Sequence, residues 1–317
     1  MKKFDQKELE NTPLPTIPSV AGWKEISVNE GGEKLVPLGL FSDFSEIFTS
    51  SIYFGEHENS PYTTAELEGS LLTSFIREGG AKALKKAQEL LPENLYLVVF
   101  DPYRTLKVQG SLYEQYYREL KELHQDWNEE QLATETQKYV SIPSDNPARP
   151  SPHNTGGSVD VAIYELPQGK HFDGSNPEVV QMHGKLLDFG TPFDHGDKEA
   201  ALSYLEQLAK EQALTPEEED AMKNRRILYK VMIEVGFEPY QDEWWHYNSK
   251  QSQMGAKTSG ALEATFGGIQ LNSEHLAHEE KRRAYYFEQV EKFKKGEISI
   301  NPRSLQFPLA AGIAPSK

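Results

Sequence analysis

The spacing of apolar residues predicts helices that alternate with short strands. Residues 67–76 and 83–91 place apolar side chains three or four positions apart, which is typical of one face of a helix. Residues 95–100 form a short, continuous apolar run instead. That run predicts a buried strand, and Asp101 and Arg104 follow at its C-terminal end.

Three further helices are predicted between residues 111 and 236. Residues 111–139 have helical spacing but are dense in charge, which favours a solvated helix that covers a sheet. Residues 198–212 predict another helix. The segment 215–219 then offers a threonine cap, a proline and an acidic first turn, so a helix should begin there and stop at Gly236.

The two ends of the chain differ from its middle. Residues 1–35 are rich in proline, glycine and charge, and we interpret them as an extended arm that is laid on the body or partly mobile. Residues 264–271 predict one more strand, and residues 272–295 predict a terminal helix that precedes a proline-containing tail. Residues 159–163 predict a strand at the centre of the chain.

Composition excludes several classes of protein. The 317 residues are 37% hydrophobic and 26% charged, as in ordinary globular proteins. Because 49 acidic residues outnumber 33 basic ones, the net charge of −16 disfavours nucleic acid as a partner. No apolar run approaches the roughly 18 to 20 residues of a membrane helix, so no membrane span is expected. The absence of cysteine excludes disulfides and thiolate metal ligands.

The N-terminus lacks the pattern of a secretion signal. Met1 is followed by two lysines, but an apolar core does not follow them. Cytoplasm is therefore the default expectation. A protein whose signal had been removed would look the same, which leaves the periplasm as the alternative.

Two motifs together contain the side chains of a catalytic zinc site. Residues 151–160 supply His153 and Asp160, and residues 243–246 supply Glu243 and His246. A catalytic zinc takes three protein ligands and keeps one position for water, and a nearby carboxylate that is not a ligand can accept a proton from that water. We expect the two histidines and the aspartate to bind Zn²⁺, with Glu243 as the base.

The spacing within each motif requires an irregular backbone. His153 and Asp160 are an odd number of residues apart, so an uninterrupted strand would send their side chains to opposite faces. The glycines at 156 and 157 permit a turn or bulge that resets the register. Glu243 and His246 are three residues apart, so we expect Glu243 at an irregular entrance to a strand.

The same residues resemble a known family. The run SPHNTGGSVD at 151–160 is similar to the first zinc motif of the D-alanyl-D-alanine dipeptidases of the vancomycin-resistance type, with Ser158 where that family usually has alanine. Residues 224–247 resemble the second zinc segment of that family along its whole length. Residues 99–104 and 189–194 resemble two further blocks in the same order. The resemblance covers roughly residues 64–248.

The resemblance implies roles for individual residues. It implies zinc on His153, Asp160 and His246, Glu243 as the general acid and base, and Arg104 as the residue that stabilises the oxyanion. Pro102 and Thr105 depart from the family pattern, so the loop that carries Arg104 is expected to differ in shape.

Three residues are candidates for substrate binding. The resemblance implies that the Ser151 hydroxyl contacts the carboxylate of the substrate, while capping or turn formation is the alternative. Tyr103 is expected to bind the substrate, and with Asp101 it either orients the Arg104 guanidinium or closes a turn. Asp194 is the best candidate to meet the ammonium group of a dipeptide, because an unpaired buried charge is costly. Its alternative is a turn-forming aspartate.

Other histidines and the tryptophans receive a simpler interpretation. His275 and His278 are expected to be solvent-facing helix residues, because Arg282 stands where a second zinc-binding histidine would be needed. Trp244 and Trp245 are expected to be wall and core material, although one of them could line the substrate pocket.

The predicted fold is α+β, with a small, mostly antiparallel sheet that carries the zinc site and is backed by helices. We expect an N-terminal arm at 1–63, a zinc dipeptidase core at 64–250 and a C-terminal extension at 251–317 packed on the core. The expected function is hydrolysis of a small D,D-dipeptide, D-alanyl-D-alanine above others. The alternatives are a D,D-carboxypeptidase that acts on longer peptidoglycan stem peptides and a zinc-binding module without turnover.

Overall fold

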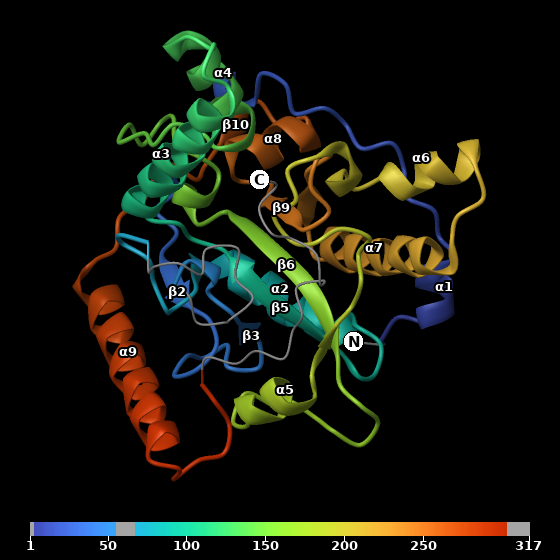
Figure 1. Ribbon diagram of the computed structural model, residues 1–317, viewed down its shortest axis with the longest axis vertical. Helices are drawn as coiled ribbons and strands as arrows, with labels where there is room; N and C mark the ends of the chain where they lie inside the picture. Colours follow the sequence, from blue (N-terminus) through green and yellow to red (C-terminus); the bar gives the residue numbers. More distant parts are fainter. Residues whose placement is uncertain (1–2, 55–66, 303–317) are drawn as a thin grey trace.

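The computed structural model describes residues 3–54 and 67–302, apart from the side chains of 138 and 139, and its centre is a six-stranded sheet (Figure 1). Strand β3 lies parallel to β5, and the other pairings in this sheet are antiparallel. The sheet runs in the order β3 (Phe48–Thr49), β5 (Leu95–Asp101), β6 (Ser158–Glu165), β9 (His246–Ser249) and β8 (Phe237–Pro239), and β7 (Lys185–Leu186) also pairs with β6.

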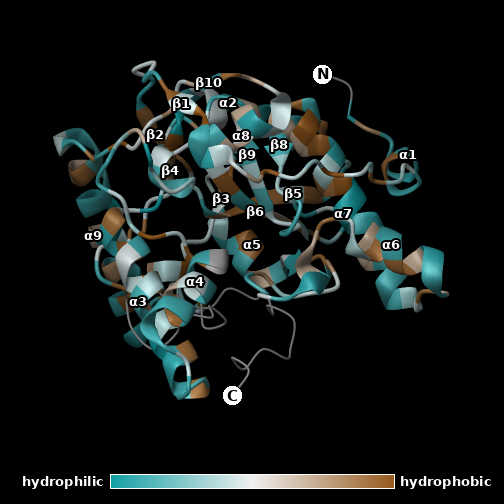
Figure 2. Cartoon of the chain, turned by 90° about the horizontal axis from the view of Figure 1, so that it is seen from above, coloured by the Kyte–Doolittle hydropathy of each residue, from teal (hydrophilic) through white to brown (hydrophobic). Residues whose placement is uncertain are grey.

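Helices α2 (Glu78–Leu90) and α7 (Pro216–Glu234) pack against the central sheet, where Leu84 and Leu228 join one hydrophobic core with β5 and β6. Figure 2 shows apolar residues gathered toward the centre of the molecule and polar residues toward its periphery. The other helices are α1 (Gln6–Glu10), α3 (Leu106–Leu123), α4 (Glu129–Tyr139), α5 (Pro177–His183), α6 (Tyr204–Glu211), α8 (Gln253–Ser259) and α9 (Ser273–Lys294).

Two small sheets join the N-terminal segment to the rest of the molecule. Strand β1 (Ser27–Val28) pairs in parallel with β10 (Glu263–Ala264), and β2 (Leu35–Pro37) pairs with β4 (Phe75–Arg77). Helix α1 packs against α7, so the N-terminal arm is laid on the body as far as it is described. The boundary expected at residue 63 lies outside the described residues, and β3, which precedes it, belongs to the central sheet.

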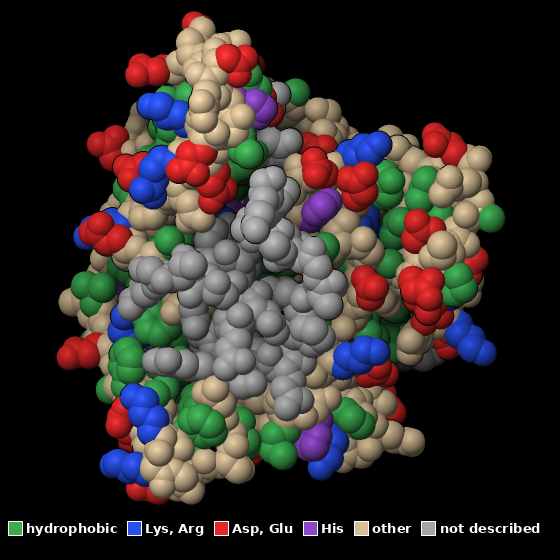
Figure 3. Space-filling model, viewed as in Figure 1, with side chains coloured by type: hydrophobic (Ala, Val, Ile, Leu, Met, Phe, Trp, Pro, Cys, Tyr) green, Lys and Arg blue, Asp and Glu red, His purple; other side chains and the backbone are tan. Residues whose placement is uncertain are grey.

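The expected combination of helices with a small sheet is confirmed. The predicted strand at 95–100 is β5, the helix expected after Thr215 is α7, and the terminal helix is α9. The acid-rich surface is also visible, because Figure 3 shows acidic side chains spread over the flanks of the molecule near α4 and α6. Among the described helices, none is long and apolar enough to cross a membrane.

Some predicted elements are wrong. The helix expected over 67–76 is a loop followed by strand β4, because the backbone of Phe75 and Ile76 is hydrogen-bonded to β2. The predicted strand at 264–271 is reduced to β10, and the helix at 111–139 is two helices separated by a turn. The helix expected over 198–212 is also shorter, because residues 198–200 form a 3-10 turn ahead of α6.

The prediction for His275 is also wrong, because this residue is buried rather than exposed to solvent. Its Nδ1 accepts a hydrogen bond from the Asn272 backbone at 3.0 Å, and its Nε2 lies 3.1 Å from the Leu35 carbonyl oxygen. The ring thus caps its own helix and fastens α9 to β2. His278 is half-buried.

The capping box of α7 yields a test of the fold. The Thr215 hydroxyl accepts from the Glu218 backbone at 3.2 Å, and the Glu218 carboxylate accepts from the Thr215 backbone at 2.8 Å. We expect Thr215→Ala to lower the free energy of unfolding by about 0.5–2 kcal/mol, because the Glu218 N–H loses the hydroxyl that accepts from it. Urea denaturation measures the loss. Thr215→Ser keeps the hydroxyl and should stay close to wild type, and an unchanged alanine variant would contradict the prediction.

Candidate metal centre

Strand register places the second and third candidate ligands directly opposite each other. Asp160 on β6 pairs with His246 on β9, so residues far apart in the sequence become cross-strand neighbours. On the other side of β6, Asp160 pairs with Asp101 at the end of β5. The register of β5 shifts between Val99 and Asp101, a bulge of the kind that re-aims side chains next to functional sites.

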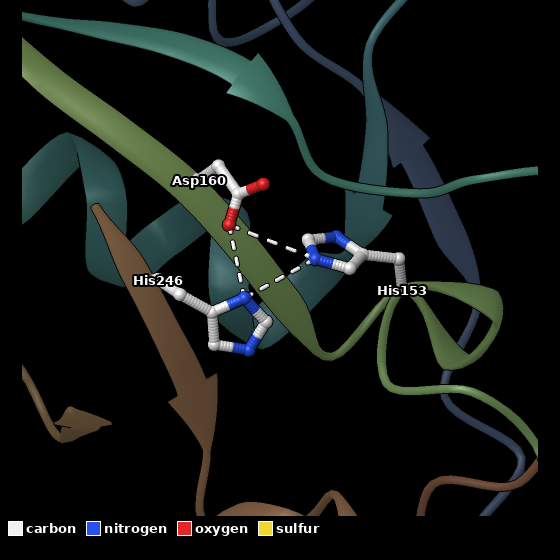
Figure 4. A group of neighbouring side chains, drawn as sticks. All are labelled: His153, Asp160 and His246. Carbon is white, nitrogen blue, oxygen red and sulfur yellow. Dashed lines mark hydrogen bonds and ion pairs between the residues drawn. The ribbon is translucent and has the colours of Figure 1, made fainter. Parts of the chain in front are cut away.

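A tight turn before β6 brings back the first candidate ligand. His153 begins a 3-10 turn that ends at Thr155, and Gly156 then adopts the left-handed conformation with φ +66°. A side chain is disfavoured at this angle, and a Cβ on Gly156 would also overlap Leu35. The sharp reversal directs the His153 ring toward Asp160 and His246 (Figure 4).

The three donor atoms form a triangle that fits a tetrahedral metal. His246 Nδ1 lies 3.0 Å from Asp160 Oδ1 and 3.2 Å from His153 Nε2, and the third side, from His153 Nε2 to Asp160 Oδ1, is 3.6 Å (Figure 4). Zinc ligands at 2.0–2.2 Å in tetrahedral geometry would be about 3.3–3.6 Å apart. Shifts of a few tenths of an ångström would therefore place all three donors on one ion.

Each histidine has a partner that fixes its tautomer. His153 Nδ1 lies 3.1 Å from the Pro102 carbonyl oxygen, which can only accept, so this nitrogen carries the proton. His246 Nε2 lies 3.2 Å from the side-chain oxygen of Asn248. The inward nitrogens, Nε2 of His153 and Nδ1 of His246, are then left with lone pairs. Metal-ligating histidines are oriented in this way.

The electrostatic environment of the three candidate ligands favours a cation between them. Burial lowers the pKa of His153 to about 3, so its imidazole is neutral and able to bind a metal. Burial, with the nearby charge of Asp101, raises the pKa of Asp160 well above its usual range. A divalent cation at the triangle would offset the cost of the buried Asp160 carboxylate.

Glu243 lies beside this group without completing it. It precedes β9 in an irregular segment, and one of its carboxylate oxygens is 3.6 Å from His246 Nδ1. The side chain stays 30% exposed, which leaves it in reach of water. Burial of the remainder, together with the charges of Asp160 and Asp194, raises the pKa of Glu243 to about 8.

Buried aromatic residues anchor the segment that carries Glu243. Trp244 stacks on Phe189 with ring centroids 4.1 Å apart, and its indole N–H donates to the Thr191 hydroxyl at 2.9 Å. The Trp245 carbonyl accepts from the Val161 backbone on β6. Both tryptophans are core residues, at 1% and 2% exposure, as the sequence suggested.

Arg104 is held against Asp101 at the end of β5. Its Nε donates to Asp101 Oδ2 at 2.9 Å, its Nη2 donates to the same oxygen, and its Nη1 donates to Gln109 Oε1 at 3.0 Å. Among the described residues, its other two N–H groups have no acceptor. Asp101 therefore orients the guanidinium, as one of the two sequence interpretations held, and leaves donors for a substrate.

The loop of Arg104 is bound directly to the turn of His153. The Arg104 backbone N–H donates to the His153 carbonyl at 3.2 Å, and the Asn154 side-chain amide donates to the Arg104 carbonyl at 2.6 Å. Displacement of either segment would therefore disturb the other.

Three supporting residues escaped the sequence interpretation. Gln109 accepts from Arg104 and, at 3.2 Å, from the Ser151 hydroxyl, while its own amide donates to the Ser141 carbonyl. Tyr53 donates to Asp101 at 2.8 Å, and Asn154 is 2.6 Å from the Ser151 hydroxyl. Asn154 lies in the first motif but has no role that its residue type would indicate, and nothing in the local sequence distinguishes Gln109 and Tyr53.

The three residues expected to bind substrate have different surroundings. The Tyr103 hydroxyl donates to the Ile269 carbonyl at 2.9 Å, so it takes no part in the pair of Asp101 and Arg104. Asp194 is exposed, has φ +65°, and lies near enough to Glu243 and Asp160 to influence their pKa values. The substrate roles expected for Tyr103, Ser151 and Asp194 stay predictions.

Comparison with known proteins shows what this chain is similar to. A family model described as D-ala-D-ala dipeptidase, of the M15 peptidases, matches residues 73–264. A D-alanyl-D-alanine dipeptidase of Synechocystis is 26% identical in an alignment 192 residues long that covers 55% of this chain and 68% of the relative. One of Enterococcus faecium is 25% identical over 53% of this chain and 69% of its own. One of Streptomyces coelicolor is 32% identical over 32% and 38%, respectively.

Gly156 provides a test of the turn that carries the candidate ligand His153. We expect Gly156→Ala to lose about 1–2 kcal/mol of stability from the left-handed backbone alone. Overlap with Leu35 should in addition displace His153 and weaken metal binding by about tenfold or more. Chelator competition measures the affinity for zinc.

Gly169→Ala is the matched control for this variant. Gly169 has φ +81°, but an added Cβ would meet no atom within 4 Å. It should therefore show similar backbone strain with unchanged metal affinity. Equal affinities in both variants would mean that the turn tolerates displacement.

Proposed function

The chain belongs to the D-Ala-D-Ala dipeptidase family of metallopeptidases, and from this we propose that it hydrolyses D-alanyl-D-alanine to two molecules of D-alanine. We further propose that the metal is a single Zn²⁺ on His153, Asp160 and His246. The donor triangle, with sides of 3.0, 3.2 and 3.6 Å inside the matched region, carries the proposal.

Each remaining residue of the site has one task in this reaction. When bound, zinc would polarise the scissile carbonyl and acidify water. The Glu243 carboxylate would take a proton from the attacking water and return it to the nitrogen of the leaving amine. The two N–H groups of Arg104 that face no described acceptor would stabilise the negative charge that develops on the carbonyl oxygen.

The other two candidate functions have less support. A zinc-binding module without turnover would need neither Glu243 nor Arg104, yet both lie beside the donor triangle. The pKa values of all three candidate ligands include an effect of the Arg104 charge, so this guanidinium lies close to them. A D,D-carboxypeptidase would use the same chemistry on a longer peptide whose amino group is blocked.

The decisive experiment measures metal content and two activities. The purified protein should contain one zinc per chain and release D-alanine from D-alanyl-D-alanine, and removal of zinc with a chelator should abolish the release. N-acetyl-D-alanyl-D-alanine imitates a longer stem peptide and should be a poor substrate. Faster hydrolysis of the acetylated compound would favour the carboxypeptidase, and zinc binding without either activity would favour the module.

Glu243 is expected to act on protons and not on the metal. Glu243→Gln keeps the size of the side chain but removes its basicity, so the variant should retain one zinc per chain. Its kcat should fall by about 10²- to 10⁴-fold, the usual effect of a missing acid or base. Elemental analysis and initial rates measure the two properties. A zinc-loaded variant with wild-type rates would assign the base elsewhere.

Asp194 is expected to recognise the ammonium group of the dipeptide. Its carboxylate lies near Glu243 and Asp160, and both of those carboxylates already have other tasks in the proposal. Asp194→Asn should reduce kcat/KM for D-alanyl-D-alanine about tenfold more than for its N-acetylated form, because only the free dipeptide presents a charge there. Equal losses on both compounds would leave Asp194 with the turn-forming role that its φ of +65° also allows.

A further inference from the structure

Arg77 connects four distant parts of the chain through one buried guanidinium. It ends strand β4, its side chain is 1% exposed, and each of its five N–H groups has an acceptor. Nε donates to the Thr155 carbonyl at 2.8 Å. Nη1 donates to Glu30 at 2.9 Å and to the Glu33 carbonyl, and Nη2 donates to Glu30 and to the Gly267 carbonyl, each at 3.1 Å.

Two of the contacts of Arg77 fall on the turn that carries His153. The turn ends at Thr155, whose carbonyl accepts from the guanidinium, and the next carbonyl, of Gly156, accepts from the Arg77 backbone at 2.9 Å. Consecutive peptide groups are thereby fixed in orientation. His153 contributes one corner of the donor triangle, so its position depends on this attachment.

The other contacts hold the guanidinium from both ends of the chain. The Glu30 carboxylate bonds both terminal nitrogens of Arg77 and also accepts from the Gly267 and Gly32 backbones at 2.7 and 2.9 Å. Phe266 lies under the guanidinium, 4.7 Å from it. A planar fork bound on every side has one orientation only, which a flexible ammonium would not reproduce.

We propose that Arg77 is a positioning residue for the metal centre, and that through Glu30 and Gly267 the segments before and after the dipeptidase motifs set the affinity for metal. The proposal rests on the proposed function for the presence of zinc. Loss of a residue that orients a metal ligand commonly lowers the affinity for the metal by about 10- to 100-fold. The terminal segments thus acquire a role in the site although they provide no ligand.

A second arginine and glutamate pair offers a matched control. Arg226 and Glu206 form two hydrogen bonds of 2.6 and 2.8 Å, Glu206 accepts from the Leu14 backbone at 3.1 Å, and Arg226 donates to the Glu10 carbonyl at 2.7 Å. This pair also anchors the N-terminal segment. It joins that segment to α6 and α7, and none of these contacts involves the turn of His153.

The test compares metal binding in the wild type, Arg77→Lys, Glu30→Gln and Glu206→Gln. The dissociation constant for Zn²⁺ is measured by chelator competition, the absorption spectrum of the Co²⁺ form reports the geometry of the ligands, and thermal unfolding reports stability. We expect the dissociation constant to rise about 10- to 100-fold in Arg77→Lys and about threefold or more in Glu30→Gln, with altered Co²⁺ spectra. Glu206→Gln should lose stability while its affinity and spectrum remain those of the wild type.

Each other outcome is decisive. Wild-type affinity in both Arg77→Lys and Glu30→Gln would overturn the inference and leave the proposed function intact. An equal loss of affinity in Glu206→Gln would also overturn it, because general destabilisation would then explain the effect. A wild type that binds neither metal would overturn the proposed function and the inference together. If Arg77→Lys does not fold, Glu30→Gln alone decides.

Discussion

Two buried carboxylates that face each other across neighbouring strands set the main constraint on this structure. The register of β5 and β6 pairs Asp101 with Asp160, and a protein interior holds two such charges only when positive charge compensates each of them. Arg104 compensates Asp101, and its charge keeps the pKa of that carboxyl low although burial opposes this. A cation bound between Asp160 and the two imidazoles would do the same on β6. The positive groups that the reaction needs are therefore also those that the fold needs.

The segment at 266–269 lies outside the family motifs but contacts the residues around the donor triangle. Its Gly267 carbonyl accepts from Arg77, while the backbone of Ile269 accepts from the Tyr103 hydroxyl and donates to the Asn154 carbonyl. One short stretch thus contacts both the loop of Arg104 and the turn of His153. Because those two segments are also bonded to each other, relative movement between Arg104 and the donor triangle would break several hydrogen bonds at once.

The sequence predicted two kinds of feature: those formed by residues close together in the chain, and those that only a few residue types can form. The cap of α7 could be predicted because Thr215 and Glu218 are three residues apart. The three side chains of the donor triangle could be selected because few residue types bind zinc. The role of Arg77 could not be predicted, because its hydrogen-bond acceptors lie far apart in the sequence, from Glu30 to Gly267. Periodicity failed at Phe75 for a related reason. A short apolar run fits a helix or a strand equally, and pairing with β2 decides between them.

The raised pKa of Glu243 bears on the role proposed for this residue. Burial raises its pKa to about 8, so the carboxyl by itself would keep its proton at neutral pH and could not act as a base. The positive charge of Arg104 acts in the opposite direction, and a dication at the neighbouring donors would add to that effect. Nearby carboxylates, Asp160 above all, would lose their influence once a metal neutralised them. If Glu243 is the base and a dication occupies the donor triangle, as proposed, the side chain that moves the proton would be made competent by the same cation that acidifies the water, and an empty site would lack a functional base.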